Sequence, residues 1–213
     1  MAIAATRSYS YKRSVFINCP FDQAFKPVLD AIIFTVHDCG FQVRIALEDA
    51  GSGQARMDKI VKLIFQSQYA ICDLSRVDGP RLNMAFETGL VLGAKYFGGT
   101  KQKAKDLLVL DQVEHQYKKT LSDLGGVDGA IHCNDPATAV GCVRLFLARK
   151  SQDPNIPGEA FIVRRFKRFQ DDLKLMTAVP GARFNAQELD DLKYIPELIN
   201  TMVAWQRLPD PMS

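Results

Sequence analysis

The sequence contains no run of about 18 apolar residues, the length at which a segment becomes a candidate membrane-spanning helix. Its five cysteines are an odd number and include no Cys-x-x-Cys pair, so a disulfide framework is not favoured. The first residues also lack the charged, apolar and small-residue segments of a secretory signal. We therefore expect a cytoplasmic protein, kept in a reducing compartment and without a membrane partner.

An excess of charge of one sign is also lacking. Lys and Arg number 27 against 24 Asp and Glu, and a net charge of +3 is too small to predict an electrostatic grip on nucleic acid. The three histidines are dispersed, with no metal-ligand spacing among themselves or with cysteines. Neither Gly-x-Gly-x-x-Gly nor Gly-Lys-Ser/Thr occurs. We expect no direct nucleic-acid binding, no metal site and no resident cofactor.

What the sequence does contain is an alternation of short apolar runs and helical patterns. With 213 residues, 47% of them hydrophobic, it can bury one sizeable core. Strands are expected at 14–18, 41–47, 69–74, 106–110 and 130–133, and helices at 22–39, 54–67, 83–97 and 135–150. Strands that are apolar throughout and alternate with helices predict a parallel sheet covered on both faces. We expect a flavodoxin-like (Rossmann-like) doubly wound α/β fold with strand order 2-1-3-4-5.

The chain is expected to divide into an α/β domain over 1–150 and a helical extension over 151–213. Two helices, at 161–176 and 185–205, are predicted in the extension. The first of these helices contains a basic cluster of Arg164, Arg165, Lys167 and Arg168. We interpret this cluster as the solvated face of an amphipathic helix. The alternative is a contact with an anion or a nucleic acid. Apolar side chains of the second helix predict packing on the main domain or on another subunit.

A doubly wound sheet binds its ligand beyond the carboxyl ends of its strands, at the switch point between strands 1 and 3. Asp73 ends the third predicted strand, and Glu87 is expected in the first turn of a helix that begins at Asn83. Two carboxylates at one sheet edge repel each other unless something there uses them. The alternative is that Asn83 is an ordinary N-cap and that the helix dipole stabilises Glu87. Gly89 and Gly93 are expected to let this helix lie close to the sheet.

Three segments carry a resemblance to a known family. They are Phe16 to Asp22 (FINCPFD), the strand end Ile71-Cys72-Asp73, and Asn83 to Gly89 (NMAFETG) followed by Gly93. Over roughly residues 14 to 133 the chain resembles the nucleoside 2-deoxyribosyltransferases and the related TIR-like nucleotide-binding domains of bacterial defence systems. In the transferases a Gly-Pro-Phe or Ala-Pro-Phe loop lines the sugar pocket, and Cys19-Pro20-Phe21 stands in its place. Their nucleophilic glutamate lies in an Ala-Phe-Glu-x-Gly segment, which Ala85 to Gly89 matches.

The chain departs from the transferases in the loop before this glutamate. They have an acidic, glycine-rich loop there, whereas this chain has Asp78-Gly79-Pro80-Arg81-Leu82. Arg81 favours an anion near the site, and therefore a nucleotide over a free nucleoside. The alternative for Arg81 is a solvated loop charge.

The resemblance implies that Glu87 is the catalytic residue, because a fixed carboxylate can stabilise or attack the sugar as an N-glycosidic bond breaks. Asp73 would hold sugar hydroxyls or help the base leave, and Phe21 would stack on the ring. Asn83 would hydrogen-bond either the sugar or its own helix. The complete set of expected substrate-binding residues is Asn18, Cys19, Pro20, Phe21, Asp22, Asp73, Ser75, Arg81 and Asn83.

Two further positions leave alternatives open. Cys19 is either a reactive thiol or, as is more common for this residue type, a small buried hydrophobe. His132 and Asn134 follow the fifth predicted strand and are expected at a surface strand end, the alternative being a place at the border of the pocket.

The leading functional expectation is an enzyme that cleaves or transfers the N-glycosidic bond of a nucleotide or nucleoside, with NAD among the substrates considered. The resemblance extends this expectation to an anti-phage defence effector that forms homo-oligomers and is controlled by a regulatory protein partner. One alternative is a non-catalytic module that senses a nucleotide and signals to a partner protein. The other is an unrelated flavodoxin-like signalling domain.

Overall fold

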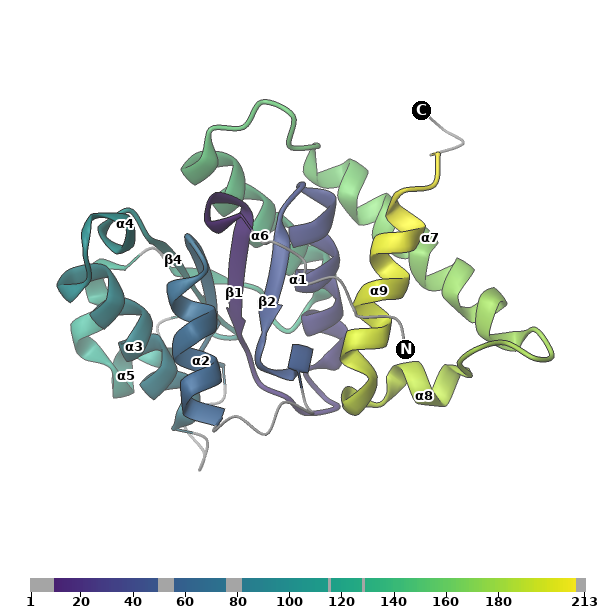
Figure 1. Cartoon of the computed structure of the whole chain (residues 1–213), viewed down its shortest axis with the longest axis horizontal. Helices are drawn as coiled ribbons and strands as arrows, with labels where there is room; N and C mark the ends of the chain where they lie inside the picture. Colours follow the sequence, from purple (N-terminus) through teal and green to yellow (C-terminus); the bar gives the residue numbers. More distant parts are fainter. Residues whose placement is uncertain (1–9, 50–55, 76–81, 115, 128, 210–213) are drawn as a thin grey trace, which may run out of the picture.

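The central element of the fold is a five-stranded parallel sheet in the order β2-β1-β3-β4-β5 (Figure 1). The computed structural model describes residues 10–49, 56–75, 82–114, 116–127 and 129–209. The strands are β1 (Ser14–Asn18), β2 (Gln42–Ile45), β3 (Tyr69–Asp73), β4 (Asp106–Asp111) and β5 (Gly129–Ile131). The predicted flavodoxin-like α/β fold and its strand order are confirmed.

The strand register brings polar residues to the same edge of the sheet. Asn18, the last residue of β1, pairs with Cys72, and Asp73 pairs with Leu110. On the far side of β4, Asp111 pairs with Ile131. Because all strands are parallel, their carboxyl ends meet at one edge, which is where a fold of this kind binds ligands.

Helices cover both faces of the sheet. Val15 and Ile17 of β1 pack in a core with α1 (Lys26–Asp38) and α6 (Pro136–Ser151), whereas Phe16 packs in a second core on the opposite face. That second face carries α2 (Arg56–Phe65), α3 (Asn83–Phe97) and α5 (Gln116–Thr120), with α4 (Thr100–Lys103) after α3. Short 3-10 helices in the described ranges lie at Tyr11–Arg13, Ala46–Asp49, Ser122–Gly126 and Leu192–Tyr194.

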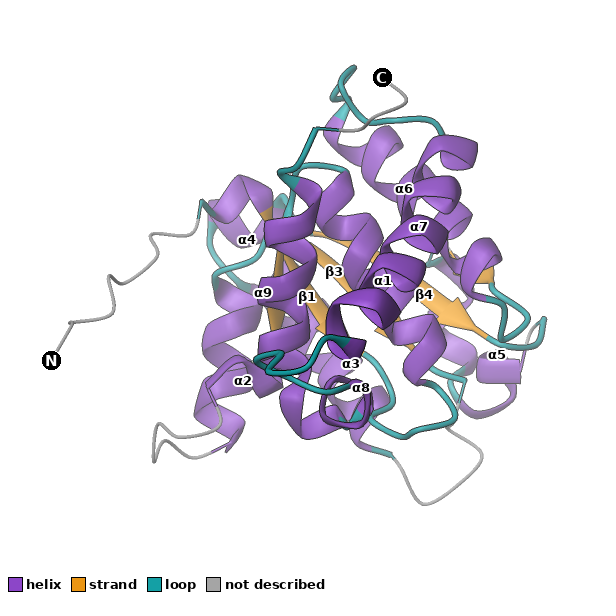
Figure 2. Ribbon diagram, turned by 90° about the vertical axis from the view of Figure 1, so that its right-hand side faces the viewer, coloured by secondary structure: helices purple, strands orange, loops and turns teal. Residues whose placement is uncertain are grey.

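The C-terminal helices form an additional layer over α1 (Figures 1 and 2). They are α7 (Glu159–Ala178), α8 (Ala186–Asp190) and α9 (Ile195–Gln206). The ring of Phe34 on α1 lies 5.2 Å from that of Phe166, 5.6 Å from Phe169 and 5.9 Å from Trp205, measured between centroids. Of the two packing alternatives, the structure therefore shows the one in which the extension packs on the α/β part.

Local contacts shift several predicted boundaries. The first helix begins at Lys26 and not at 22, because a carboxylate oxygen of Asp22 accepts the backbone N–H of Phe25 and holds a turn there. The single helix predicted over 185–205 is wrong. It is interrupted after α8, where the Asp191 side chain caps the backbone N–H of Lys193, and α9 then begins at Ile195 with Pro196 in its first turn.

The interpretation of the basic cluster on α7 is wrong for one member. Arg165 is buried, with its guanidinium 3.1 Å from a carboxylate oxygen of Asp38 and 5.1 Å from the Trp205 ring centroid. It ties the C-terminal layer to α1, so it is not part of a solvated face. Within the described ranges, no helix combines the length and the apolar character needed to cross a membrane.

Candidate functional site

Asn18 connects the end of β1 to helix α3. Its buried amide nitrogen donates to the backbone oxygen of Met84 at 2.9 Å and to the hydroxyl of Thr88 at 3.5 Å. Met84 and Thr88 lie on either side of Glu87 on the inner face of α3. Asn18 therefore helps to fix the position of α3, and with it that of Glu87, relative to the end of β1.

Glu87 is buried, with 6% of its surface exposed, and makes no hydrogen bond or ion pair with any residue the structure describes. Burial raises the pKa of its carboxyl group, and the positive charge of Arg56 opposes this shift. The expectation that Glu87 lies in the first turn is wrong: the helix begins at Asn83, and its first turn contains no acidic residue. Desolvation therefore outweighs any stabilisation of the ionised form by the helix dipole.

Glu87 and Asp73 both lie near Cys72. Burial raises the pKa of the Cys72 thiol to about 12, and the negative charges of Glu87 and Asp73 both contribute to the increase. Cys72 is the penultimate residue of β3. The two carboxylates that the sequence predicted at this edge thus both act on the same buried thiol.

Asp73 is fully buried beside Ser75 and His132. One carboxylate oxygen of Asp73 accepts the backbone N–H of Ser75 at 3.0 Å, and the other lies 2.9 Å from Nε2 of His132. This second approach is a close electrostatic contact without the alignment of a hydrogen bond, so Oδ2 has no hydrogen-bond partner among the described residues. The hydroxyl oxygen of Ser75 also lies near the ring, 3.0 Å from Nε2.

The surroundings of His132 determine which ring nitrogen carries the proton. Its Nδ1 accepts the backbone N–H of Asn134 at 3.0 Å, so the neutral ring is assigned its proton on Nε2, which donates to Ser75. A Ser-His-Asp triad needs the opposite arrangement, with the serine and the carboxylate on different ring nitrogens and the histidine accepting the serine proton. The Asp73–Ser75–His132 cluster is therefore built to orient Ser75, not to make it a nucleophile.

His132 is the residue whose environment sequence reasoning missed. It was expected at a surface strand end, but the side chain is fully buried, with its ring 5.8 Å from that of Phe25 between centroids. The backbone N–H of His132 donates to Asp111, which continues the strand pairing by one residue. The available signal was its place directly after a strand at the ligand-binding edge, next to the strand that Asp111 ends.

The loop after β1 turns its first residues inward. Cys19 and Pro20 are buried and Phe21 is half-buried against the main core. Burial, together with the nearby charge of Asp73, raises the pKa of the Cys19 thiol well above its usual range. Of the two interpretations of Cys19, the buried hydrophobe is the one seen, since a protonated thiol is a poor nucleophile. Stacking of Phe21 on a ligand stays a prediction.

The remaining predicted residues lie around the start of α3. Asn83 is exposed and occupies the first helical position; Leu82 is the N-cap residue, and no side chain caps this end. The N-cap interpretation of Asn83 is therefore wrong. Arg81 lies outside the described residues. The expectation for Gly89 and Gly93 is also wrong, because a Cβ atom at either position would meet nothing within 4 Å.

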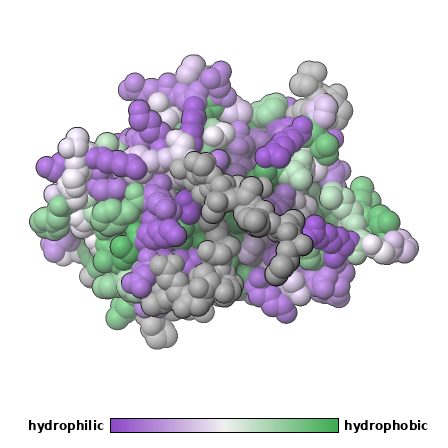
Figure 3. Space-filling model, in the orientation of Figure 1, coloured by the Kyte–Doolittle hydropathy of each residue, from purple (hydrophilic) through white to green (hydrophobic). Residues whose placement is uncertain are grey.

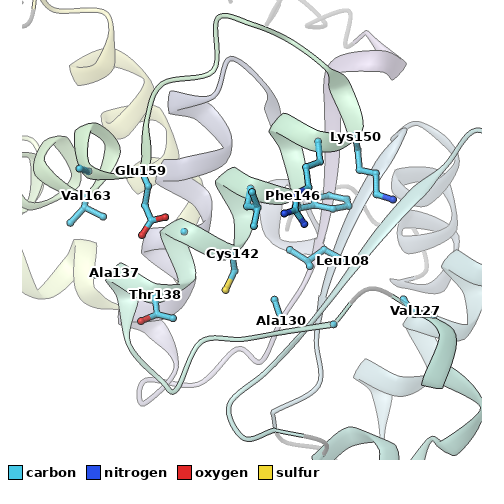
Figure 4. A pocket seen from close by; sticks show the side chains of 15 residues that line it. Leu108, Val127, Ala130, Ala137, Thr138, Cys142, Phe146, Lys150, Glu159 and Val163 are labelled. Atoms are coloured by element: carbon cyan, nitrogen blue, oxygen red, sulfur yellow. The ribbon is translucent and has the colours of Figure 1, made fainter.

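A separate cavity of about 1030 Å³ lies between β5, α6 and α7 (Figure 4). Its lining includes Ala130, Cys142, Phe146 and Val163, with Glu159 at the α7 side. None of the residues predicted for the nucleotide site lines this cavity. Within the described ranges, no group of three or more His, Cys, Asp or Glu side chains is arranged to hold a metal ion.

Comparisons of the chain with protein-family models, with curated proteins and with solved structures found no match.

Proposed function

We propose that the protein cleaves or transfers the N-glycosidic bond of a nucleotide or nucleoside, with Glu87 as the catalytic carboxylate. The observation that carries this proposal is the state of Glu87, which is buried and has neither a hydrogen bond nor an ion pair to any described residue. A carboxyl group on a largely buried side chain without protein partners is uncommon, and such groups concentrate where a ligand or a reaction uses them. The match of Ala85 to Gly89 with the transferase segment supports the same role.

Two acceptor atoms at the carboxyl edge of the sheet support a ligand that carries hydroxyl groups. Asn18 Oδ1 and Asp73 Oδ2 are both buried and have no hydrogen-bond partner among the described residues. They come from neighbouring strands, since Asn18 pairs with Cys72, the residue before Asp73. Both atoms lack a hydrogen-bond donor, and the hydroxyl groups of a sugar are such donors.

The proposed chemistry uses the carboxylate directly. As the bond between the anomeric carbon and the base nitrogen breaks, its electron pair leaves with the base and positive charge develops on the sugar. Glu87 either stabilises this charge or bonds to the anomeric carbon, and water or a second base then takes the sugar. Ser75 receives a hydrogen bond from His132, so its own hydroxyl proton is free to bind a sugar oxygen.

The finer parts of the proposal rest on the family resemblance. They are NAD as one of the substrates, a role as a cytoplasmic anti-phage effector, assembly into homo-oligomers and control by a regulatory protein. Phe21, Asp22, Arg81 and Asn83 are proposed to complete the substrate contacts. No resident cofactor is part of the proposed reaction.

A second candidate function is a nucleotide sensor that does not turn its ligand over. The burial that raises the pKa of Glu87 favours this alternative, because it disfavours the ionised form that a nucleophile requires. In a sensor, binding at the same edge would be signalled to a partner protein.

The test is to incubate the purified protein with NAD, ATP, dATP and deoxynucleosides and to measure released base by chromatography. Glu87→Gln is assayed beside it, and Glu159→Gln, at an exposed glutamate on α7, is the matched control. Release that is lost in Glu87→Gln and kept in Glu159→Gln supports the enzyme. Binding by calorimetry without release supports the sensor. Release that survives Glu87→Gln, or neither binding nor release, contradicts the proposal for Glu87.

A further inference from the structure

The outer face of α3 is uncharged and apolar, which is unusual for an exposed helix. Between Asn83 and Phe97 the only charged residues are Glu87, which is buried, and Lys95, whose ammonium donates to the backbone oxygen of Lys105. Large apolar side chains are instead exposed there: Phe86 by 55%, Tyr96 by 66% and Phe97 by 92%. Hydrophobic residues gather at the left of the space-filling view, on the side where α3 lies (Figure 3).

Two glycines leave a part of the helix surface without side chains, between these aromatic residues. Gly89 and Gly93 are four residues apart, and a Cβ added to either would point into open space. They are spaced with Phe86 and with Tyr96 along one side of the helix. A helix without side chains at such positions allows another backbone to approach closely.

The neighbouring helix α2 extends the apolar surface. Met57, Val61 and Phe65 recur every four residues, which places them on one side of α2, and all three are exposed. Charged Arg56, Asp58 and Lys62 lie next to them in sequence and are also exposed. An apolar centre with a polar border is the usual composition of a protein interface.

On the opposite face of the molecule, the apolar outer side of a helix is covered by other helices. Helix α1 is also apolar on its outer side, where Phe34 is fully buried by Phe166, Phe169 and Trp205 from the C-terminal layer. No described segment covers α3 in the same way, since its outer residues remain exposed. Among the described residues, the outer face of α3 is therefore an apolar surface without a partner.

We propose that this face, formed by α3 and the exposed side of α2, is the interface of a homodimer in which α3 packs against α3 of a second copy. A two-fold contact requires one patch to be complementary to itself. The face of α3 meets this requirement for two reasons. It has no free charge to repel its copy, and it carries both projecting aromatic rings and glycine positions that leave space for another helix. This inference deepens the homo-oligomer part of the proposed function by assigning it a surface, and it does not depend on the role proposed for Glu87.

The spacing also defines how the two helices pair. An antiparallel arrangement centred on residue 91 sets Gly89 opposite Gly93 and Phe86 opposite Tyr96 of the second copy. It also opposes the two helix dipoles, which is the favourable orientation. Two Phe86 residues would then be roughly 15 Å apart along the axis, at a rise of about 1.5 Å per residue.

The first test is sedimentation equilibrium of the full chain from about 1 to about 100 μM, where interfaces of moderate affinity form. The wild-type protein is expected to reach twice the mass of one chain. Gly93→Leu and Phe97→Glu are expected to weaken dimerisation at least about tenfold, and both point outward, so circular dichroism should show an unchanged fold. Leu175→Glu, at an exposed position on α7, is the matched control and should have no effect.

The second test is disulfide cross-linking in a background where the exposed Cys133 is replaced by serine. A mixture of Phe86→Cys and Tyr96→Cys chains is expected to cross-link, whereas Phe86→Cys alone is not. Cross-linking of Phe86→Cys with itself would overturn the antiparallel pairing. A monomer at every concentration, or a dimer that is weakened by Leu175→Glu and not by Gly93→Leu, would overturn the proposed interface and leave this face to a different partner.

Discussion

The ring nitrogen Nε2 of His132 lies 2.9 Å from Oδ2 of Asp73, and both side chains are fully buried. They come from the ends of β5 and β3, with β4 between them. The Nε2–H group donates its hydrogen bond to the hydroxyl of Ser75. His132 thus stabilises the Asp73 carboxylate and orients Ser75 at the edge where Glu87 lies.

Removing this ring should destabilise the protein. His132→Ala leaves a cavity and a buried carboxylate that keeps only its hydrogen bond from the Ser75 backbone N–H, and we expect a loss of about 3 kcal/mol in the free energy of unfolding. His132→Gln keeps an N–H donor near the position of Nε2 and should lose less than half as much. Urea unfolding measures both, and equal losses for the two variants would contradict the donor role.

Asn18 should be sensitive to charge as well as to truncation. Asn18→Ala removes the hydrogen bond to Met84 and should cost about 1–2 kcal/mol. Asn18→Asp places a carboxylate against the Met84 carbonyl oxygen, so its loss should be larger at neutral pH and should shrink as the solution is acidified. Unfolding curves at two pH values would distinguish these effects, and a loss for Asn18→Asp that does not depend on pH would argue against the contact.

Glu87→Gln should increase stability while it removes function. Because burial raises the pKa of this carboxyl in the folded protein, ionisation of Glu87 lowers stability as the pH rises from its unfolded pKa through its folded pKa. Glu87→Gln removes this loss, so its melting temperature should exceed that of the wild type at neutral pH and the difference should vanish in acid. Differential scanning calorimetry across this range is the measurement, and a variant less stable than the wild type at neutral pH would contradict the prediction.

Lys105 should give the protein a stability gain at alkaline pH. Its ammonium is buried, donates to the backbone oxygens of Ile64 and Ser67, and has a pKa lowered by burial from 10.5 to about 8. Between these values the unfolded chain binds more protons, so stability rises with pH by up to roughly 3 kcal/mol from this group. Lys105→Met should lack this rise, and the difference between the two proteins in urea unfolding at about pH 8 and pH 10 isolates it. Parallel pH profiles would contradict the lowered pKa.

Trp205 reports on the C-terminal layer because it is the only tryptophan. Its ring packs on Phe34 and Phe169, so we expect its fluorescence and the far-ultraviolet circular dichroism to change together in one unfolding transition. Phe34→Ala should cost about 3–5 kcal/mol. Leu175→Ala, at an exposed position, should change stability by less than about 0.5 kcal/mol. Fluorescence that changes well before the circular dichroism would show that the layer unfolds separately.

The sequence by itself determined the features that depend on short-range patterns. Apolar runs and helical spacing predicted the sheet, its strand order and the bounds of α3, Asn83–Phe97. Local hydrogen bonds were equally predictable, such as the cap of Asp135 on α6 and the capping box of Asn185 and Glu188. These interactions join residues three or four positions apart, so their spacing is visible in the sequence.

The tertiary structure decided which side chains are buried and what they meet. His132 and Ser75 are 57 residues apart in sequence, and Arg165 and Asp38 are 127 apart, so no local pattern predicts either pair. The positions of Gly89 and Gly93 were likewise decided by the packing of α3, which turns them toward solvent and not toward the sheet. Periodicity shows which residues share a helix face, but only packing against distant segments determines the direction in which that face points.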